Sequence, residues 1–279
     1  VGADVTTRLH QVRQAFKSLT LEADAPPKNQ IVRSAKPALQ GQDGLALERL
    51  IVVNDEGIPL PVAILSAAMG TDIKARRAVM VVDGPDGKAG VLTLRRDLIE
   101  TLALQGLVVC VPDVRPYGEL RRNRGPQELN GTVFGRPELA VAAHDVRCVM
   151  AALRNRPDVA AGTIACLGFG EGAVVALAAG MMEPDLSPVA AIDIGETYGA
   201  ADRHPRLPRI LSVGDLPHLA ATLTPRRLWI HGAAQPDAFA WTQQAYARSG
   251  APHQITVSGT SAPVDNAVLV AWVAQNVTP

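Results

Sequence analysis

The residues with the clearest chemical signature form a glycine-rich turn between an apolar strand and an apolar helix, "TIACLGFGEGAVVALAAG" at 163–180. In dinucleotide binding, G-x-G-x-x-G/A brings backbone N–H groups close to a pyrophosphate, and Gly168, Gly170 and Ala173 fit this pattern. In serine-dependent hydrolysis, G-x-S-x-G lifts a serine hydroxyl above a sheet on a strained turn. Gly168, Gly170 and Gly172 fit that second pattern, with glycine in the serine position.

The elements that must position this turn are predicted to alternate between strand and helix. Continuous apolar strands interleaved with helices are typical of a parallel sheet covered on both faces. After a buried strand that ends near Val82 and a glycine-rich loop, the pattern predicts helices at 91–106, 138–153, 171–182, 237–248 and 264–275. It predicts further strands at 107–113, 163–167, 189–194, 227–231 and 254–257, and a long loop at 113–137.

The first part of the chain differs from this alternation. Apolar spacing predicts a helix at 6–19, prolines mark a loop at 25–44, and two strands at 45–53 and 60–66 flank the turn "NDEGIP" as an antiparallel hairpin. We therefore expect one α/β domain at 45–279, with residues 1–44 forming an N-terminal helix and linker packed on it.

The dinucleotide hypothesis has one local success, because Asp193 lies 25 residues after Gly168, close to the spacing of a ribose-binding acid. The place of the glycine motif along the chain argues against this hypothesis. That fingerprint normally opens the first βαβ unit, whereas several strands and helices are predicted before Gly168. Dinucleotide binding through Gly168, Gly170 and Ala173 therefore stays as the less favoured hypothesis.

Four segments resemble α/β-hydrolases related to bacterial acetyl xylan esterases and dienelactone hydrolases. They are "LALERLIVVNDEGIPLPVAILSA" (45–67), "NGTVFGRPELAVAAHDVRCVMAALRNRP" (130–157), "PDVAAGTIACLGFGEGAVVALAAG" (157–180) and "LSVGDLPHLAATLTPRRLWIHGAAQPDAFAWTQQAYARSG" (211–250). The resemblance implies an α/β-hydrolase fold: a mainly parallel central sheet, helices on both faces and an N-terminal antiparallel hairpin. It implies no cofactor and no metal ion.

The resemblance also locates three positions of a catalytic triad, and each holds an unsuitable residue. Gly170 stands in the nucleophile position without a side chain, and Gln235, in "HGAAQP", stands in the acid position without a charge. Ser261, or as the less favoured alternative Ala262, stands in the base position, where the triad needs an imidazole. Asp237 is a substitute acid, although capping of the following helix is the simpler role. Three losses together predict a catalytically degenerate site.

The oxyanion hole is expected to use the backbone N–H of Glu171 and an N–H from residues 83–88, "DGPDGK", which contribute Gly84 and Gly87. Pro85 has no N–H. The carboxylates of Asp83, Asp86 and Glu171 would oppose a developing oxyanion if they pointed inward, and Lys88 is a candidate to offset one of them.

Other polar residues give weaker signals. Asp113 ends a predicted strand, where it either lines the cleft or ties down the following loop with Arg115, and His231 is expected to face the cleft. Structural roles are favoured for the pair His144–Asp145 inside a helix and for His204 and His218 in loops. The cysteines Cys110, Cys148 and Cys166 lie in apolar segments without recognised metal-ligand spacing and are interpreted as core residues.

The bulk composition limits the partners. Lys plus Arg equals Asp plus Glu, 27 each, so no net charge favours nucleic acid or an anionic membrane. No apolar run has the ~20 residues of a membrane helix, and nothing indicates the compartment. The leading hypothesis is a degenerate esterase-like domain that binds a small ester or carbohydrate, or contacts a second hydrolase domain or another copy of itself. The alternative is an active carboxylic ester hydrolase with a non-standard site.

Overall fold

The computed structural model describes residues 2–20, 29–33, 39–40, 44–68, 75–121, 133–160, 162–199, 204–259 and 263–277. The first half contains α1 (Gly2–Thr20), β1 (Asn29–Arg33), β2 (Leu39–Gln40), β3 (Leu45–Asn54), β4 (Pro59–Ala67), β5 (Ala78–Val82), α2 (Gly87–Leu94), α3 (Arg96–Leu104), β6 (Val108–Pro112) and the 3₁₀ turn η1 (Gly118–Leu120). The second half contains α5 (Glu138–Arg154), β7 (Ile164–Phe169), α6 (Glu171–Met182), β8 (Leu186–Ile192), α7 (Ile210–Val213), α8 (Leu216–Ala221), β9 (Leu228–His231), η2 (Pro236–Phe239), α9 (Ala240–Arg248), η3 (Pro252–Gln254), β10 (Ile255–Ser258) and α10 (Asn266–Asn276).

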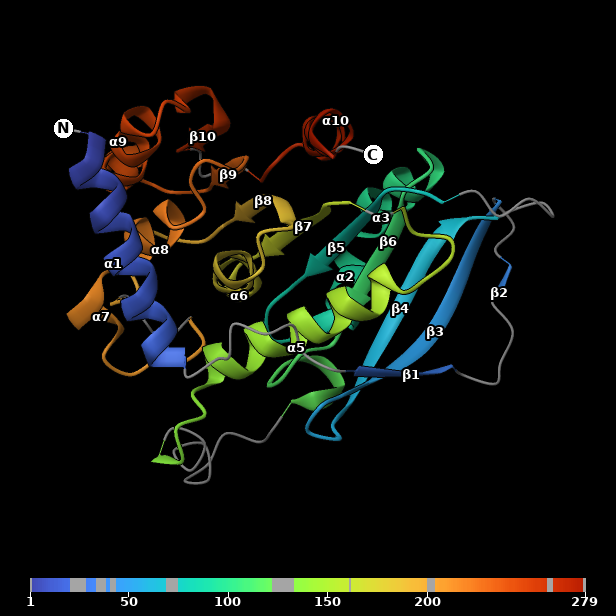
Figure 1. The fold of residues 1–279 in the computed structure, drawn as a ribbon. Helices are drawn as coiled ribbons and strands as arrows, with labels where there is room; N and C mark the ends of the chain where they lie inside the picture. The colour runs from blue at the N-terminus through green and yellow to red at the C-terminus, as the bar shows by residue number, and fades with distance from the viewer. Residues whose placement is uncertain are drawn as a thin grey trace.

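The described strands form one sheet in the order β1-β3-β4-β6-β5-β7-β8-β9-β10, and β2 also pairs with β3 (Figure 1). Strands β6, β5, β7, β8, β9 and β10 are mutually parallel. The hairpin β3–β4 is antiparallel, and β4 joins β6 antiparallel. The mainly parallel sheet with an antiparallel hairpin at its start confirms the predicted architecture.

Side chains alternate between the two faces of the sheet, as the period of a strand requires. In β5, Met80 and Val82 pack into one buried cluster with α5, α6 and α8, while Val79 and Val81 pack into another with α2, α3 and α10. Both faces are therefore covered, which explains the continuous apolar strands.

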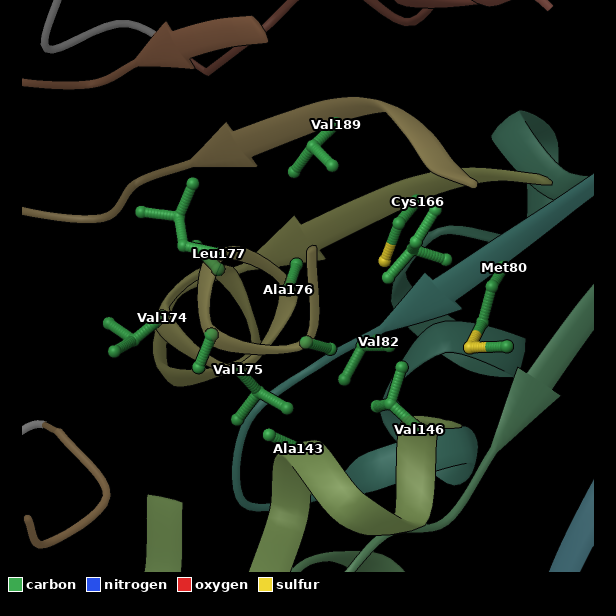
Figure 2. Close-up of a cluster of buried hydrophobic side chains, with 14 of the residues drawn as sticks. Met80, Val82, Ala143, Val146, Cys166, Val174, Val175, Ala176, Leu177 and Val189 are labelled. Carbon is green, nitrogen blue, oxygen red and sulfur yellow. The ribbon is translucent and has the colours of Figure 1, made fainter. Parts of the chain in front are cut away.

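Helix α6 lies at the centre of the larger cluster. Its residues from Gly172 to Met182 are all buried, and Figure 2 shows Val174, Val175 and Leu177 of α6 among side chains of the strands and of α5. A helix that is apolar on every side needs such complete coverage. The element that begins at the glycine turn is thus held on all sides.

The N-terminal helix α1 packs against α5, α7, α8 and α9. Its Phe16 is 1% exposed and belongs to the larger core cluster.

Several predicted boundaries need correction. Strands β1 and β2 lie within the stretch 25–44 predicted as loop, because this stretch pairs with the edge of the hairpin through β3. The single helix predicted at 91–106 is two helices, α2 and α3, interrupted at Arg95, whose φ of −121° is not helical. In the stretch 113–137, residues 118–120 form η1, and residues 122–132 lie outside the described part of the chain. Strand β8 also begins and ends earlier than predicted.

His218 lies in α8 rather than in a loop. Across the described residues, no helix combines the length and the apolarity needed to cross a membrane.

Candidate functional site

The glycine turn, residues 168–172, is a sharp bend between β7 and α6, and we call it the elbow. Gly170 has φ 55° and ψ −120°. Glycine adopts this backbone conformation freely, but a residue with a side chain would be strained in it. A Cβ built on Gly170 would meet nothing within 4 Å. The backbone at this position therefore has the conformation of a nucleophile elbow, and there is space for a side chain at residue 170.

Glycine is required at the two flanking positions, 168 and 172, for a different reason. A Cβ on Gly168 would lie 2.5 Å from the carbonyl oxygen of Gly172, and a Cβ on Gly172 would lie 2.4 Å from the carbonyl oxygen of Val82. Both atoms belong to the backbone and cannot rotate away. Gly168 and Gly172 are thus required by the close packing of α6 on β7 and β5, independently of any bound pyrophosphate.

The loop expected to complete an oxyanion hole does lie beside the elbow. A Cβ on Gly84 would be 3.4 Å from the Cβ of Glu171 and 3.6 Å from its backbone nitrogen. The N–H of Gly84 donates to the carboxylate of Asp83 (2.7 Å), and the N–H of Gly87 donates to the carbonyl of Gly84 (2.9 Å). These two N–H groups are therefore already engaged in the loop's own structure.

The carboxylates of this region have partners of their own. Asp83 accepts a hydrogen bond from Nε of Arg95 (2.8 Å), whose guanidinium lies 3.6 Å from the ring centre of Phe169. Burial raises the pKa of Tyr117 well above its usual range, and the neighbouring carboxylate of Glu171 raises it further. Asp86 has a side chain 72% exposed. Asp83 and Glu171 thus each have a partner beside the elbow, Arg95 and Tyr117 respectively.

Lys88 does not offset these carboxylates, contrary to expectation. Its ammonium group donates to Asp113 (2.8 Å) and to Glu119, and its backbone N–H donates to Asp113 (2.7 Å). Asp113 is 1% exposed and also accepts from the N–H of Glu119. Asp113 therefore ties the loop after β5 to the loop after β6, and its partner in doing so is Lys88 rather than Arg115. Gly87 allows this contact, because a Cβ there would lie 2.3 Å from Asp113.

The position expected for the triad acid follows β9. Gln235 is exposed, and its backbone N–H donates to the carboxylate of Glu196. Asp237 is also exposed and lies in the first turn of η2. The predicted capping role of Asp237 is wrong, because α9 begins after Phe239 and has no side-chain cap.

His231 ends β9 and is 4% exposed. Its Nδ1 lies 2.9 Å from the hydroxyl of Ser258, which ends β10 and also accepts from the indole N–H of Trp229 (3.0 Å). This contact joins the two last strands of the sheet. Ser261, in the position expected for the base, lies outside the described residues.

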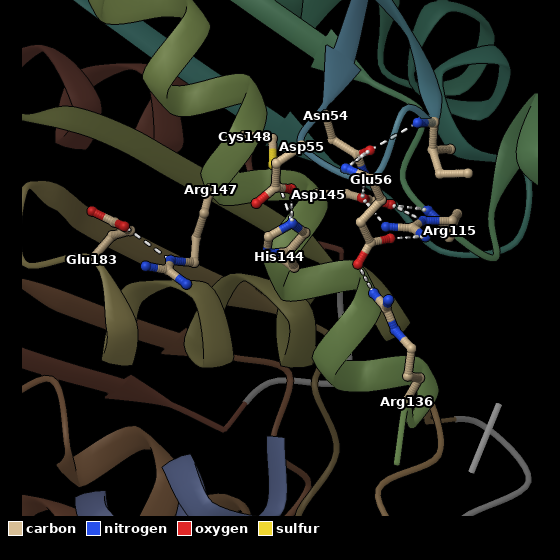
Figure 3. Close-up of polar contacts among 11 residues, drawn as sticks. Asn54, Asp55, Glu56, Arg115, Arg136, His144, Asp145, Arg147, Cys148 and Glu183 are labelled. Atoms are coloured by element: carbon tan, nitrogen blue, oxygen red, sulfur yellow. Dashed lines mark hydrogen bonds and ion pairs between the residues drawn. The ribbon is translucent and has the colours of Figure 1, made fainter. Parts of the chain in front are cut away.

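A second polar site was missed by the sequence analysis. It comprises Asn54, Asp55, Arg115, His144, Asp145 and Cys148, and we call it the α5 cluster (Figure 3). Asp145, fully buried, accepts from the backbone N–H (2.9 Å), Nε (2.8 Å) and Nη2 (2.6 Å) of Arg115 and from the amide of Asn54 (3.1 Å).

In the same cluster His144 contacts both Asp55 and Cys148. The predicted structural role of the pair His144–Asp145 fits Asp145, which fixes the start of the loop after β6. The sequence did contain one signal for this contact: His144 and Cys148 are four residues apart, and residues at this spacing lie on the same face of a helix.

The strand order, the hairpin and the elbow define the α/β-hydrolase fold, which solved structures confirm. A candidate acetyl xylan esterase from Bacteroides fragilis superposes with a TM-score of 0.76 at 13% identity, over 98% of this chain and 88% of that one. A promiscuous CE15 esterase from a marine bacterial metagenome gives 0.70 at 14% identity, over 94% and 90%. Acetyl xylan esterase 1 from Thermoanaerobacterium sp. gives 0.59 at 13% identity, over 96% and 92%.

No protein-family model and no curated protein matches the sequence. At these identities the likeness establishes the fold, and function must be argued from the site.

Proposed function

We propose that this protein is a catalytically degenerate α/β-hydrolase, an esterase-like domain that performs no serine-dependent ester hydrolysis. The observation that carries the proposal is Gly170, which occupies the strained turn of the elbow with open space where a nucleophile would project. A glycine offers no atom to attack a carbonyl, and covalent catalysis is lost with it.

Three further features support the proposal. The acid position holds neutral Gln235, which cannot stabilise an imidazolium. In the loop of residues 83–88, the N–H groups of Gly84 and Gly87 are engaged locally, and Pro85 has none. The base position holds Ser261 in the sequence. Each change removes a different part of the hydrolytic mechanism.

The remaining role is binding. The open position at Gly170 would accept a small ester or a carbohydrate. The fold would otherwise serve as the structural or interaction part of an acetyl xylan esterase-like assembly, beside a second hydrolase domain or another copy of this chain.

The test compares the wild-type chain with Gly170→Ala, a matched variant that also lacks a nucleophile at the elbow. Both proteins are incubated with p-nitrophenyl acetate and with a fluorophosphonate probe, which labels activated serines. We expect no labelling of either protein and equal background hydrolysis.

Stoichiometric serine labelling of the wild type, or turnover that exceeds that of Gly170→Ala, would instead support an active ester hydrolase with a non-standard site. Mass spectrometry of the labelled peptide would then identify its nucleophile.

A further inference from the structure

Three potential metal ligands of the α5 cluster converge at one point (Figure 3). His144 and Cys148 lie one turn apart on α5, and Asp55 belongs to the turn between β3 and β4. Nε2 of His144 lies 2.7 Å from Oδ1 of Asp55 and 3.5 Å from Sγ of Cys148. All three ligand atoms lie within 4.8 Å of one another.

The geometry is close to that of a tetrahedral zinc ion. Zn–N distances of about 2.0–2.1 Å and Zn–S distances of about 2.3 Å place neighbouring ligand atoms about 3.3–3.6 Å apart. The contact between His144 and Cys148 already has this spacing. The carboxylate of Asp55 lies closer to His144 than a shared ion allows, so it would have to shift on binding, which its 37% exposed side chain permits.

The chemistry and charge of the three groups also suit zinc. Imidazole, thiolate and carboxylate are the ligands that Zn²⁺ takes in proteins. A thiolate and a carboxylate carry two negative charges, which together neutralise a divalent cation, so the buried ion would leave little net charge. The neighbouring cation Arg115 is already paired with Asp145 and Glu56.

We propose that Asp55, His144 and Cys148 bind Zn²⁺, with water completing the tetrahedron. The ion would link the β3–β4 turn to α5. Strands β4, β6 and β5 separate β3, which leads into Asp55, from β7, which leads into the elbow, and none of the three ligands belongs to the elbow. The zinc site is therefore a second site, which shares no residue with the elbow.

The test titrates the full chain with Co²⁺, because Zn²⁺ has no visible spectrum, and then displaces Co²⁺ with Zn²⁺. We expect a thiolate-to-cobalt charge-transfer band that saturates at one ion per chain and disappears when Zn²⁺ is added. Cys148→Ala should lose the band. Cys166→Ala is the matched control and should keep it, because Cys166 is equally buried but is not among the three residues whose ligand atoms converge.

A second variant keeps the test decisive if Cys148→Ala does not fold. Asp55→Asn changes a turn residue, and it should weaken Zn²⁺ binding at least about tenfold and reduce the rise in Tm that Zn²⁺ gives the wild type. The proposal is overturned if no charge-transfer band forms, if the band survives in Cys148→Ala, or if Asp55→Asn binds Zn²⁺ as tightly as the wild type.

Discussion

The elbow and the α5 cluster both lie at the edge of the sheet where the parallel strands end, yet they are built in opposite ways. At the elbow, Gly168, Gly170 and Gly172 are each explained by backbone geometry, and none has a side chain. In the α5 cluster the backbone is ordinary helix and turn, and charged side chains make the contacts.

The difference teaches that close packing of backbone fixes the flanking glycines of the elbow independently of the residue between them. Gly168 and Gly172 remain necessary because α6 packs closely on two strands, whatever stands at residue 170. The contacts of Asn54, His144 and Asp145 in the α5 cluster are needed because these side chains are buried and would otherwise lack partners.

The largest loss is expected for Asp145→Ala in the α5 cluster. The change removes the buried counter-ion of Arg115, whose side chain is 13% exposed, and leaves it paired with the more exposed carboxylate of Glu56. Breaking a buried ion pair from one side costs about 3–5 kcal/mol. Urea denaturation measures the loss, and Asp86→Ala, at an exposed carboxylate, is the control with an expected change within about 0.5 kcal/mol. A loss below about 1 kcal/mol for Asp145→Ala would show that the cluster is not a stabilising unit.

The next effect is expected at the elbow, for Gly172→Ser. The new Cβ would lie 2.4 Å from the carbonyl oxygen of Val82, and neither α6 nor β5 can move without disturbing the core. Overpacking typically costs about 1–3 kcal/mol and occasionally more, and we expect the upper end here because the clashing atom belongs to the backbone. The loss is measured as the free energy of unfolding in urea. Wild-type stability would contradict the packing explanation of this glycine.

A smaller effect is expected for Gly170→Ser, which makes the same chemical change two residues earlier. Its Cβ meets no atom, so the cost is backbone strain alone, about 1–3 kcal/mol. Gly170→Ala should be destabilised equally, because both residues carry a Cβ. The comparison fails if Gly170→Ser is less stable than Gly172→Ser in the same urea titration.

The sequence predicted the elbow better than the α5 cluster, for a physical reason. The elbow is local: a strand, five residues and a helix fix it, and Gly168 to Gly172 are read directly from one motif. Asp145 and Arg115 are 30 residues apart, and His144 and Asp55 are 89 apart. Only the sheet order brings them together. The same holds for the pairing of Lys88 with Asp113, which the sequence assigned to other partners.

The succession of strands and helices and the hairpin were predictable because apolar periodicity reports burial. The interruption of the helix at Arg95 was not, since the residues on both sides of it favour helix equally well. Strand β1 was missed because prolines dominate the stretch around it, although its pairing with β3 is decided at the sheet edge.

The smallest effect concerns pH and the helix that supports α6 from the side. Helix α8 packs against α6, and its His218 accepts, at Nδ1, a hydrogen bond from the N–H of Asp215 (3.1 Å) in a capping box. Burial lowers the pKa of His218, and Arg8 lowers it further, while Asp215 acts in the opposite direction. The folded state therefore binds the proton less readily than the unfolded state, whose histidine pKa is about 6.5. This contribution to stability is complete above that value and is lost as the pH falls from it towards the lower folded pKa.

The matched variant is His218→Gln, because glutamine at this position of a capping box can still receive the N–H but does not titrate. We expect the wild type to lose more stability than His218→Gln when urea denaturation is repeated from pH 8 to pH 5. The difference should be modest, because the ring is only half-buried and solvent screens its charge. Parallel pH profiles for the two proteins would mean that protonation of His218 does not weaken the support of α6. The pH dependence of the fold would then have to arise from other groups.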